Sequence, residues 1–222
     1  MTIGRPTAVL FDFGSTLFAH ASLTDTIVER AARLGTSVTR GRAIELAEQI
    51  RVAAHSANEL QHARDLDRAV WAARWTLLYS MADVEVPGLG ASLYEAFHAP
   101  DEWHPYEATA DVLFWLHVAG VPVGVVSNTG WDVRRVFEHH GLDGLVSTFV
   151  LSCEVGCVKP SREMFDLACE RLGAPVSEVL MVGDDPIADA GAASAGLLTL
   201  LVPAAEAGSD NGLAAVQRLL GR

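Results

Sequence analysis

The sequence contains almost no lysine and few cysteines, and both shortages limit what the protein can be. Fifteen of its sixteen basic residues are arginine, so Lys159 is the only lysine. A lone lysine among arginines indicates a position that needs a compact point charge rather than the broad guanidinium fork. The three cysteines, Cys153, Cys157 and Cys169, are odd in number and lack paired C-x-x-C spacing. They exclude a disulfide framework and a zinc site, and we expect reduced thiols in or near the core.

Positive net charge and long hydrophobic runs are missing as well. The formal net charge is -12, from 28 acidic and 16 basic residues. Binding to nucleic acid or to an anionic membrane surface needs clustered lysine and arginine, so we expect neither partner. No apolar stretch is long enough for a signal peptide or a membrane span. We therefore expect a cytoplasmic location.

Half of the residues are apolar, and their periodicity predicts an α/β fold. Short apolar runs that indicate buried strands alternate with helical spacing, and this alternation is typical of a parallel sheet covered by helices on both faces. The expected strands are residues 7–13, 121–127, 148–151, 179–182 and 197–202. The expected helices are residues 109–119, 132–140, 162–172, 187–195 and 213–220.

Residues 21–97 carry no strand signal. Their apolar residues recur at helical spacing, as at Val70, Trp71, Trp75 and Leu78. The sequence therefore predicts a separate all-helical segment inserted after the first strand of the sheet.

Polar side chains gather where the expected strands end. Ligands of parallel α/β sheets bind beyond the carboxyl ends of the strands, so these residues are expected to face one crevice. The clusters are Asp12 to Leu17 after the first strand, Ser127 to Thr129 after the second, Lys159 after the third, and Gly183, Asp184, Asp185 and Asp189 after the fourth.

This combination of residues suits phosphoryl transfer. A carboxylate such as Asp12 can attack phosphorus, and Asp12 with Asp184 offers the hard oxygen ligands that magnesium prefers. The ammonium of Lys159 would keep Asp12 ionised beside an incoming dianion. Ser127 and backbone N–H groups near Asn128 can hold phosphate oxygens.

The order and spacing of these residues resemble the four signature motifs of the haloacid dehalogenase-like superfamily: an Asp motif, a Ser or Thr, a Lys, and an acidic Gly-Asp motif. Residues 183–196 look like the acidic motif of its subfamily I, and the helical segment looks like the cap of that subfamily. The resemblance implies an α/β fold with a Rossmann-like parallel sheet core formed by residues 1–18 and 103–222. An inserted all-helical cap domain would then occupy residues 19–102.

The resemblance also implies Mg²⁺-dependent hydrolysis of a small phosphorylated metabolite, a phosphomonoester, through an aspartyl-phosphate intermediate. The roles that it implies are catalysis by Asp12 and Lys159, phosphate binding by Ser127, Asn128 and Thr16, and magnesium binding by Asp12, the backbone carbonyl of Gly14, Asp184 and Asp189. Alternatively, Asp189 is a charge that favours the N-terminus of the following helix.

The chain departs from the family pattern at Gly14. In the phosphatases of the family this position holds a second Asp, which protonates the leaving oxygen and then activates water. Loss of such an acid–base group typically lowers the rate by about 10²- to 10⁴-fold. His20 and Asp185 are candidate replacements by their proximity in sequence.

Gly14 also bears on alternative functions. In the haloacid dehalogenases the equivalent position looks like Tyr, and their acidic motif differs from Gly183-Asp184-Asp185. Both differences disfavour carbon–halogen hydrolysis by this chain. Phosphonoacetaldehyde hydrolases have Ala there but need a lysine in the cap, and residues 19–102 contain none. Two alternatives stay open: another hydrolase or a phosphotransferase on the same scaffold, and a phosphate-ligand binding or regulatory protein that has lost turnover.

Two further groups of side chains have ordinary structural interpretations. Trp71 and Trp75 lie one helical turn apart, the spacing that packing inside the helical segment requires. Arg64, Arg68 and Arg74 are expected on a solvated, salt-bridged face rather than against a substrate anion.

Overall fold

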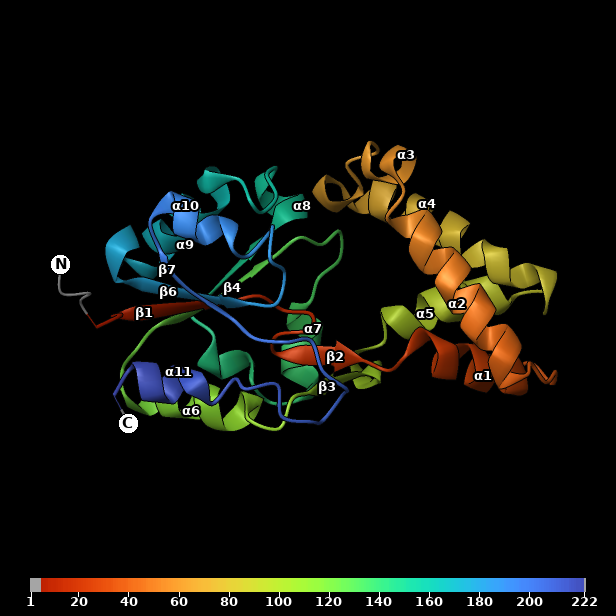
Figure 1. The fold of residues 1–222 in the computed structure, drawn as a ribbon, viewed down its shortest axis with the longest axis horizontal. Coiled ribbons are helices and arrows are strands. Elements are labelled where there is room, and N and C mark those ends of the chain that lie inside the picture. The colour runs from red at the N-terminus through yellow and green to blue at the C-terminus, as the bar shows by residue number, and fades with distance from the viewer. Residues whose placement is uncertain (1–4, 222) are drawn as a thin grey trace.

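A parallel sheet of five strands forms the centre of the protein. The computed structural model describes residues 5–221, and its main sheet has the strand order β5-β4-β1-β6-β7 (Figure 1). All four strand pairs are parallel, which confirms the expected α/β class. The strands are β1 (Ala8–Phe11), β4 (Val123–Ser127), β5 (Thr148–Leu151), β6 (Val179–Gly183) and β7 (Leu198–Leu201).

Helices cover both faces of this sheet (Figure 1). Alternate residues of β1 point to opposite faces, so Val9 and Phe11 belong to one apolar cluster while Ala8 and Leu10 belong to the other. Burial on both sides explains why β1 is apolar at every position. The covering helices are α6 (Thr109–Val118), α7 (Arg134–His139) and α11 (Ala215–Leu219) on one side, and α8 (Ser152–Val155), α9 (Arg162–Leu172) and α10 (Gly191–Ala195) on the other.

The helix expected at residues 187–195 is shorter than predicted. Regular helix begins only at Gly191, because side chains bind the backbone N–H groups before it. Asp185 accepts hydrogen bonds from the N–H groups of Ile187 and Ala188, both at 2.7 Å. Residues 186–190 therefore form turns, which is a usual effect of aspartate side chains on neighbouring backbone.

Five α-helices lie between the first and second strands of the main sheet, and together they are called the helical insert here. They are α1 (Leu23–Arg33), α2 (Arg40–Ala54), α3 (Ala57–Leu60), α4 (Arg68–Tyr79) and α5 (Leu89–Phe97). Buried residues such as Ile27, Leu46 and Leu89 give the insert its own apolar cluster. In Figure 1 the insert stands beside the sheet rather than on either of its faces. The division into two domains at residues 19–102 stays a prediction.

Two short strands that the sequence did not indicate join the insert to the sheet. β2 (Phe18–His20) pairs antiparallel with β3 (Trp103–Pro105), so the segment that enters the insert and the segment that leaves it run side by side. Short 3₁₀ helices complete the described elements: η1 (Arg64–Leu66), η2 (Ser80–Val84), η3 (Pro100–Glu102), η4 (Asp143–Leu145) and η5 (Val176–Glu178).

The cysteines agree with the sequence-based expectation of reduced thiols. Cys153, Cys157 and Cys169 are unbridged, and Cys169 is buried. Within residues 5–221, every helix is too short or too polar to pass through a lipid bilayer.

Candidate active site

The carboxyl ends of the three central strands bring the predicted residues together. Asp12 follows β1, Ser127 ends β4 and Asp184 follows β6, and these strands are neighbours in the sheet. They border a cavity of about 430 Å³. The sheet side of the cavity also holds Gly14, Asn128, Lys159, Asp185 and Asp189, and the insert side holds His55, Trp71 and Phe97.

Lys159 lies between two carboxylates in the interior. Its Nζ donates to Asp12 Oδ1 at 2.5 Å and to Asp189 Oδ1 at 2.6 Å, and only 4% of the residue is exposed. A buried ammonium is strongly disfavoured without such partners. The pairing explains why the only lysine of the chain occurs here, and it places a fixed positive charge against Asp12.

Asn128 positions this lysine through its backbone. The Nδ2 of Asn128 donates to the Lys159 carbonyl at 2.9 Å, and the Oδ1 accepts from the Lys159 N–H at 2.8 Å. This reciprocal pair occupies the side-chain amide of Asn128. The side chain of Asn128 is therefore not available to bind phosphate. Its backbone N–H stays a candidate for that role.

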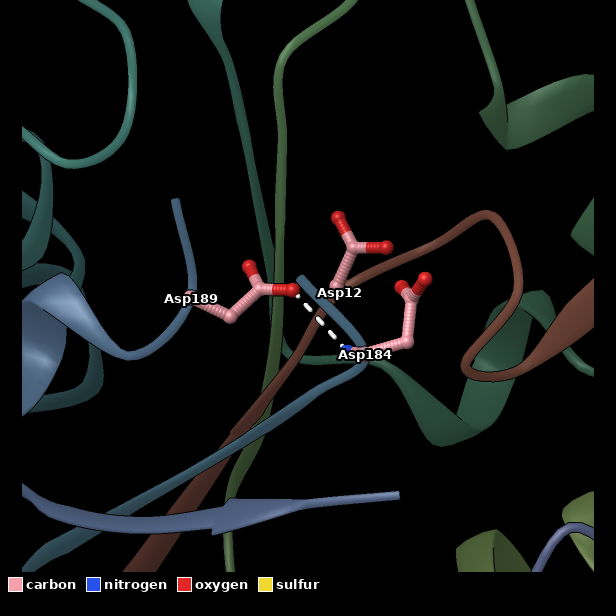
Figure 2. A group of neighbouring side chains, drawn as sticks. All are labelled: Asp12, Asp184 and Asp189. Atoms are coloured by element: carbon pink, nitrogen blue, oxygen red, sulfur yellow. Dashed lines mark hydrogen bonds between the residues drawn. The ribbon is translucent and has the colours of Figure 1, made fainter. Parts of the chain in front are cut away.

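Asp189 has both of its oxygens engaged. Oδ1 accepts from Lys159, and Oδ2 accepts from the backbone N–H groups of Asp184 and Asp185, each at 3.0 Å (Figure 2). Gly183 makes this possible, because a Cβ atom at that position would lie 2.2 Å from the Asp189 carboxyl group. Asp189 thus fixes both Lys159 and the turn that presents Asp184.

Asp12, Asp184 and Asp189 form the cluster of carboxylates drawn in Figure 2, with Asp12 between the other two in that view. One ligand oxygen from each lies within 4.8 Å of the others. Thr16, predicted to bind phosphate, is fully buried, and its hydroxyl donates to Asp184 Oδ1 at 3.2 Å. The hard oxygen donors of Asp12 and Asp184 suit Mg²⁺, which is usually held by one or two carboxylates together with water and substrate oxygens.

The electrostatics of the cluster favour a bound cation. Burial raises the pKa of Asp12 to about 7, and the charge of Asp189 adds to this effect while Lys159 opposes it. Burial and the charge of Asp189 also raise the pKa of Asp184 to about 6. Burial acts to lower the pKa of Lys159, but the carboxylates of Asp12 and Asp189 outweigh it and raise that pKa. One ammonium does not neutralise three carboxylates, and a divalent cation would offset the remaining negative charge.

These pKa values predict how the stability of the metal-free protein depends on pH. Between pH 3.8 and about 7 the folded state holds more protons on Asp12 than the unfolded chain does. The free energy of unfolding should therefore fall as the pH rises from about 5 to about 8. Urea unfolding in chelator at several pH values measures this trend, and saturating Mg²⁺ should reduce it. Asp184→Asn, which removes one of the titrating groups, should flatten the slope; an identical slope in this variant would contradict the assignment.

His20 and Asp185, the candidate replacements for the missing acid–base group, have different surroundings. His20 does not line the cavity: its Nδ1 lies 2.9 Å from the carbonyl of Ala21 and its Nε2 lies 3.3 Å from that of Ala96. These contacts remove His20 as a candidate for the acid–base role. Asp185 does line the cavity, but its Oδ1 caps the turn that follows β6.

The residues of the insert that face the cavity were not all foreseen. Trp71 is buried as expected, but it belongs to the apolar cluster on one face of the sheet and not to the cluster of the insert, and it lines the cavity together with Phe97. His55 lines the cavity as well, and no sequence pattern pointed to it. The three arginines are ion-paired as expected: Arg64 and Arg74 pair with Glu59, and Arg68 pairs with Glu154. The expected solvated face is found only at Arg68, because the side chains of Arg64 and Arg74 are only 10% and 23% exposed.

Known proteins of similar sequence include hydrolases of different specificity. An uncharacterized hydrolase of Schizosaccharomyces pombe is 42% identical over 32% of this chain, a match that spans only 34% of that protein. A ribulose-1,5-bisphosphate 5-phosphatase of Halopiger xanaduensis is 29% identical over 90% of this chain and 86% of its own. An (S)-2-haloacid dehalogenase of Pseudomonas fluorescens is 33% identical over 40% of each chain.

Comparisons with a solved structure and with a protein family agree on the scaffold. A crystal structure described as a dehalogenase with an intermediate complex superposes with a TM-score of 0.74 over 99% of both chains, at 20% identity. At this identity the likeness shows the fold alone. The family model of haloacid dehalogenase-like hydrolases matches residues 6–196, which include every strand end that borders the cavity. On this match, the chain belongs to the haloacid dehalogenase-like hydrolases.

Proposed function

We propose that the protein is a Mg²⁺-dependent phosphatase that hydrolyses small phosphomonoesters, with Asp12 as the nucleophile. The observation that carries the proposal is the position of Asp184, whose carboxylate lies beside that of Asp12 at the end of the neighbouring strand. A second carboxylate at this place serves a metal that offsets phosphate charge, whereas attack on carbon in a haloacid has no such need. The phosphatase among the relatives is consistent with the proposal.

Magnesium would be held by Asp12, Asp184 and the backbone carbonyl of Gly14, all three at the wall of the cavity. When bound, it would offset the negative charge of the phosphoryl oxygens. Asp189 was predicted to take part in magnesium binding. Because Lys159 and two backbone N–H groups engage its oxygens, we assign it a supporting role that fixes Lys159 and Asp184.

The side chains of the cavity then have separable tasks. Lys159 favours the ionised form of Asp12, so the free Asp12 oxygen can attack phosphorus and form an aspartyl-phosphate. The Ser127 hydroxyl and the N–H of Asn128 would hold phosphoryl oxygens, and water would then cleave the acyl phosphate. We propose that the helical insert acts as the cap, because His55, Trp71 and Phe97 line the cavity from that side. A volume of about 430 Å³ suits a small ester.

Phosphate release from a panel of small phosphomonoesters, with Mg²⁺ and with chelator, tests the function. We expect turnover of at least one ester, lost in chelator and restored by Mg²⁺. Asp184→Asn should raise the Mg²⁺ concentration needed for half-maximal rate, while His62→Asn, an exposed residue of the insert outside the cavity, should behave as wild type. Turnover that chelator leaves unchanged would contradict the proposed metal dependence.

The main alternative is a phosphate-ligand binding or regulatory protein, and Gly14 favours it because the usual acid–base carboxylate is absent. It predicts metal-dependent binding of a phosphorylated ligand with no release of phosphate above the background. Calorimetric titration with the same esters, run beside the release assay, separates the two functions. The dehalogenase among the relatives makes halide release from 2-haloacids a necessary parallel assay.

A further inference from the structure

The structure leaves one chemical role of the proposed phosphatase without an obvious residue. Hydrolysis of an alkyl ester needs a proton for the leaving oxygen and then a base for water, and Gly14 has no side chain to supply either. We propose that His55 of the helical insert supplies both. This inference rests on the proposed phosphatase function and names the group that completes it.

The position of His55 in the cavity wall and the hydrogen bond of its Nδ1 are compatible with such a role. It follows α2, it is exposed, and it lines the same cavity as Asp12 and Gly14. Its Nδ1 lies 2.8 Å from the carbonyl oxygen of Arg51. A carbonyl can only accept, so Nδ1 carries the hydrogen, and the lone pair of the neutral ring is on Nε2. Among residues 5–221, no other histidine lines this cavity.

The competing groups are committed elsewhere. His20 faces backbone carbonyls with both nitrogens, outside the cavity. His98 accepts a hydrogen bond from the Trp71 indole at 3.1 Å through Nε2, and its Nδ1 lies 2.8 Å from a carbonyl. Asp185 caps a backbone turn, because its Oδ1 accepts from the N–H groups of Ile187 and Ala188. His55 is thus the cavity histidine with a nitrogen available for proton exchange.

The space next to the backbone of Gly14 would accept a Cβ atom. A Cβ atom at this position would meet only the Trp103 ring, at 3.7 and 3.9 Å, which are ordinary contacts. Aromatic side chains of Phe13, Trp71 and Phe97 make up much of the remaining wall and carry no acid or base. His55, which lines the same cavity from the insert, is therefore the side chain that we assign to this task.

The proton balance closes over the two steps. In the first, Asp12 forms a bond to phosphorus as the ester P–O bond breaks, and protonated His55 transfers the Nε2 proton to the leaving oxygen, which departs as the alcohol. In the second, neutral His55 takes a proton from water as the water oxygen attacks phosphorus. The bond between Asp12 and phosphorus breaks, inorganic phosphate leaves, and both side chains return to their starting states.

The dependence on the leaving group tests this role. In His55→Asn we expect release from alkyl phosphates to fall by about 100-fold or more, because a poor leaving group needs the proton. With p-nitrophenyl phosphate the first step needs no proton because the leaving group departs as the stable nitrophenolate anion. Nitrophenolate should therefore appear in a burst, followed by slow turnover as phosphorylated enzyme accumulates. His62→Asn, an exposed control in the insert, should show neither effect. Equal rates and no burst in His55→Asn would overturn the role of His55.

Restoring the missing carboxylate provides the second arm of the experiment. In the His55→Asn background, Gly14→Asp should recover alkyl phosphate hydrolysis, since a Cβ atom at position 14 would make only ordinary contacts and the new carboxylate can exchange the proton. A structural defect of His55→Asn would not be rescued in this way, and failure of the rescue would count against the proposal. If wild type releases no phosphate from any ester while Gly14→Asp alone does, the proposed function fails for the natural chain. That result would also show that His55 does not take over the acid–base role of the carboxylate that is missing at position 14.

Discussion

Replacing Asp12 by asparagine should abolish turnover while the protein stays folded. An amide is not a nucleophile toward phosphorus, and it cannot donate the anionic oxygen that a divalent cation prefers. We expect phosphate release to fall by at least about 10⁴-fold, the scale seen when a catalytic nucleophile is removed. The fold should tolerate the change because Lys159 keeps its ion pair with Asp189 at 2.6 Å. Removing a carboxylate whose pKa burial has raised to about 7 also relieves an electrostatic cost at neutral pH.

Circular dichroism and thermal unfolding of Asp12→Asn, beside the release assay, provide the check. The spectrum should match wild type, and the midpoint of unfolding in chelator should be equal or higher. Asp185→Asn is a matched control, because this carboxylate lines the same cavity but lies outside the cluster of three. Substantial residual turnover in purified, folded Asp12→Asn would exclude Asp12 as the nucleophile.

Replacing Lys159 by methionine should damage both stability and activity. The ammonium is the shared partner of Asp12 and Asp189, and all three groups are largely shielded from solvent. Loss of one member of a buried ion pair typically costs about 3–5 kcal/mol, since the remaining charges stay buried without compensation. Activity should be lost as well, because the positive charge beside Asp12 disappears. Arginine should not restore it, since a guanidinium fork does not fit the space of a single ammonium between two carboxylates.

Urea unfolding of Lys159→Met at neutral and at mildly acidic pH measures the stability effect. The loss should shrink as the pH falls, because protonation of Asp12, whose pKa burial raises to about 7, removes part of the unpaired charge. Mg²⁺ should offset part of the loss at neutral pH. A variant as stable and as active as wild type would contradict both the buried ion pairs and the proposed mechanism.

Periodicity in the sequence predicted the sheet well. The helix at residues 162–172 and the strand at residues 148–151 have the expected limits, because an apolar pattern bounded by turn residues determines them. β2 and β3 could not be foreseen, since three residues are too few to show a period. α10 starts late because Asp185 binds the preceding backbone, an interaction that a periodic pattern does not contain.

The candidate site was predictable where it depends on strand ends. Asp12, Ser127 and Asp184 meet because parallel strands end at one edge of the sheet. The two hydrogen bonds between Asn128 and Lys159 join residues that are 31 positions apart, and neither residue type predicts them. His55 could not be identified because its place at the cavity depends on how the insert packs beside the sheet.

Detection of a covalent adduct tests the central claim, attack of Asp12 on phosphorus, most directly. His55→Asn, in which the adduct should persist longest, would be mixed with p-nitrophenyl phosphate and Mg²⁺, quenched in acid, digested and analysed by mass spectrometry; wild type would be treated in parallel. We expect the peptide that contains Asp12 to gain the mass of one phosphoryl group, and Asp12→Asn to show no gain. Phosphate release in wild type without this adduct in either protein, or an adduct on another residue, would contradict the claim.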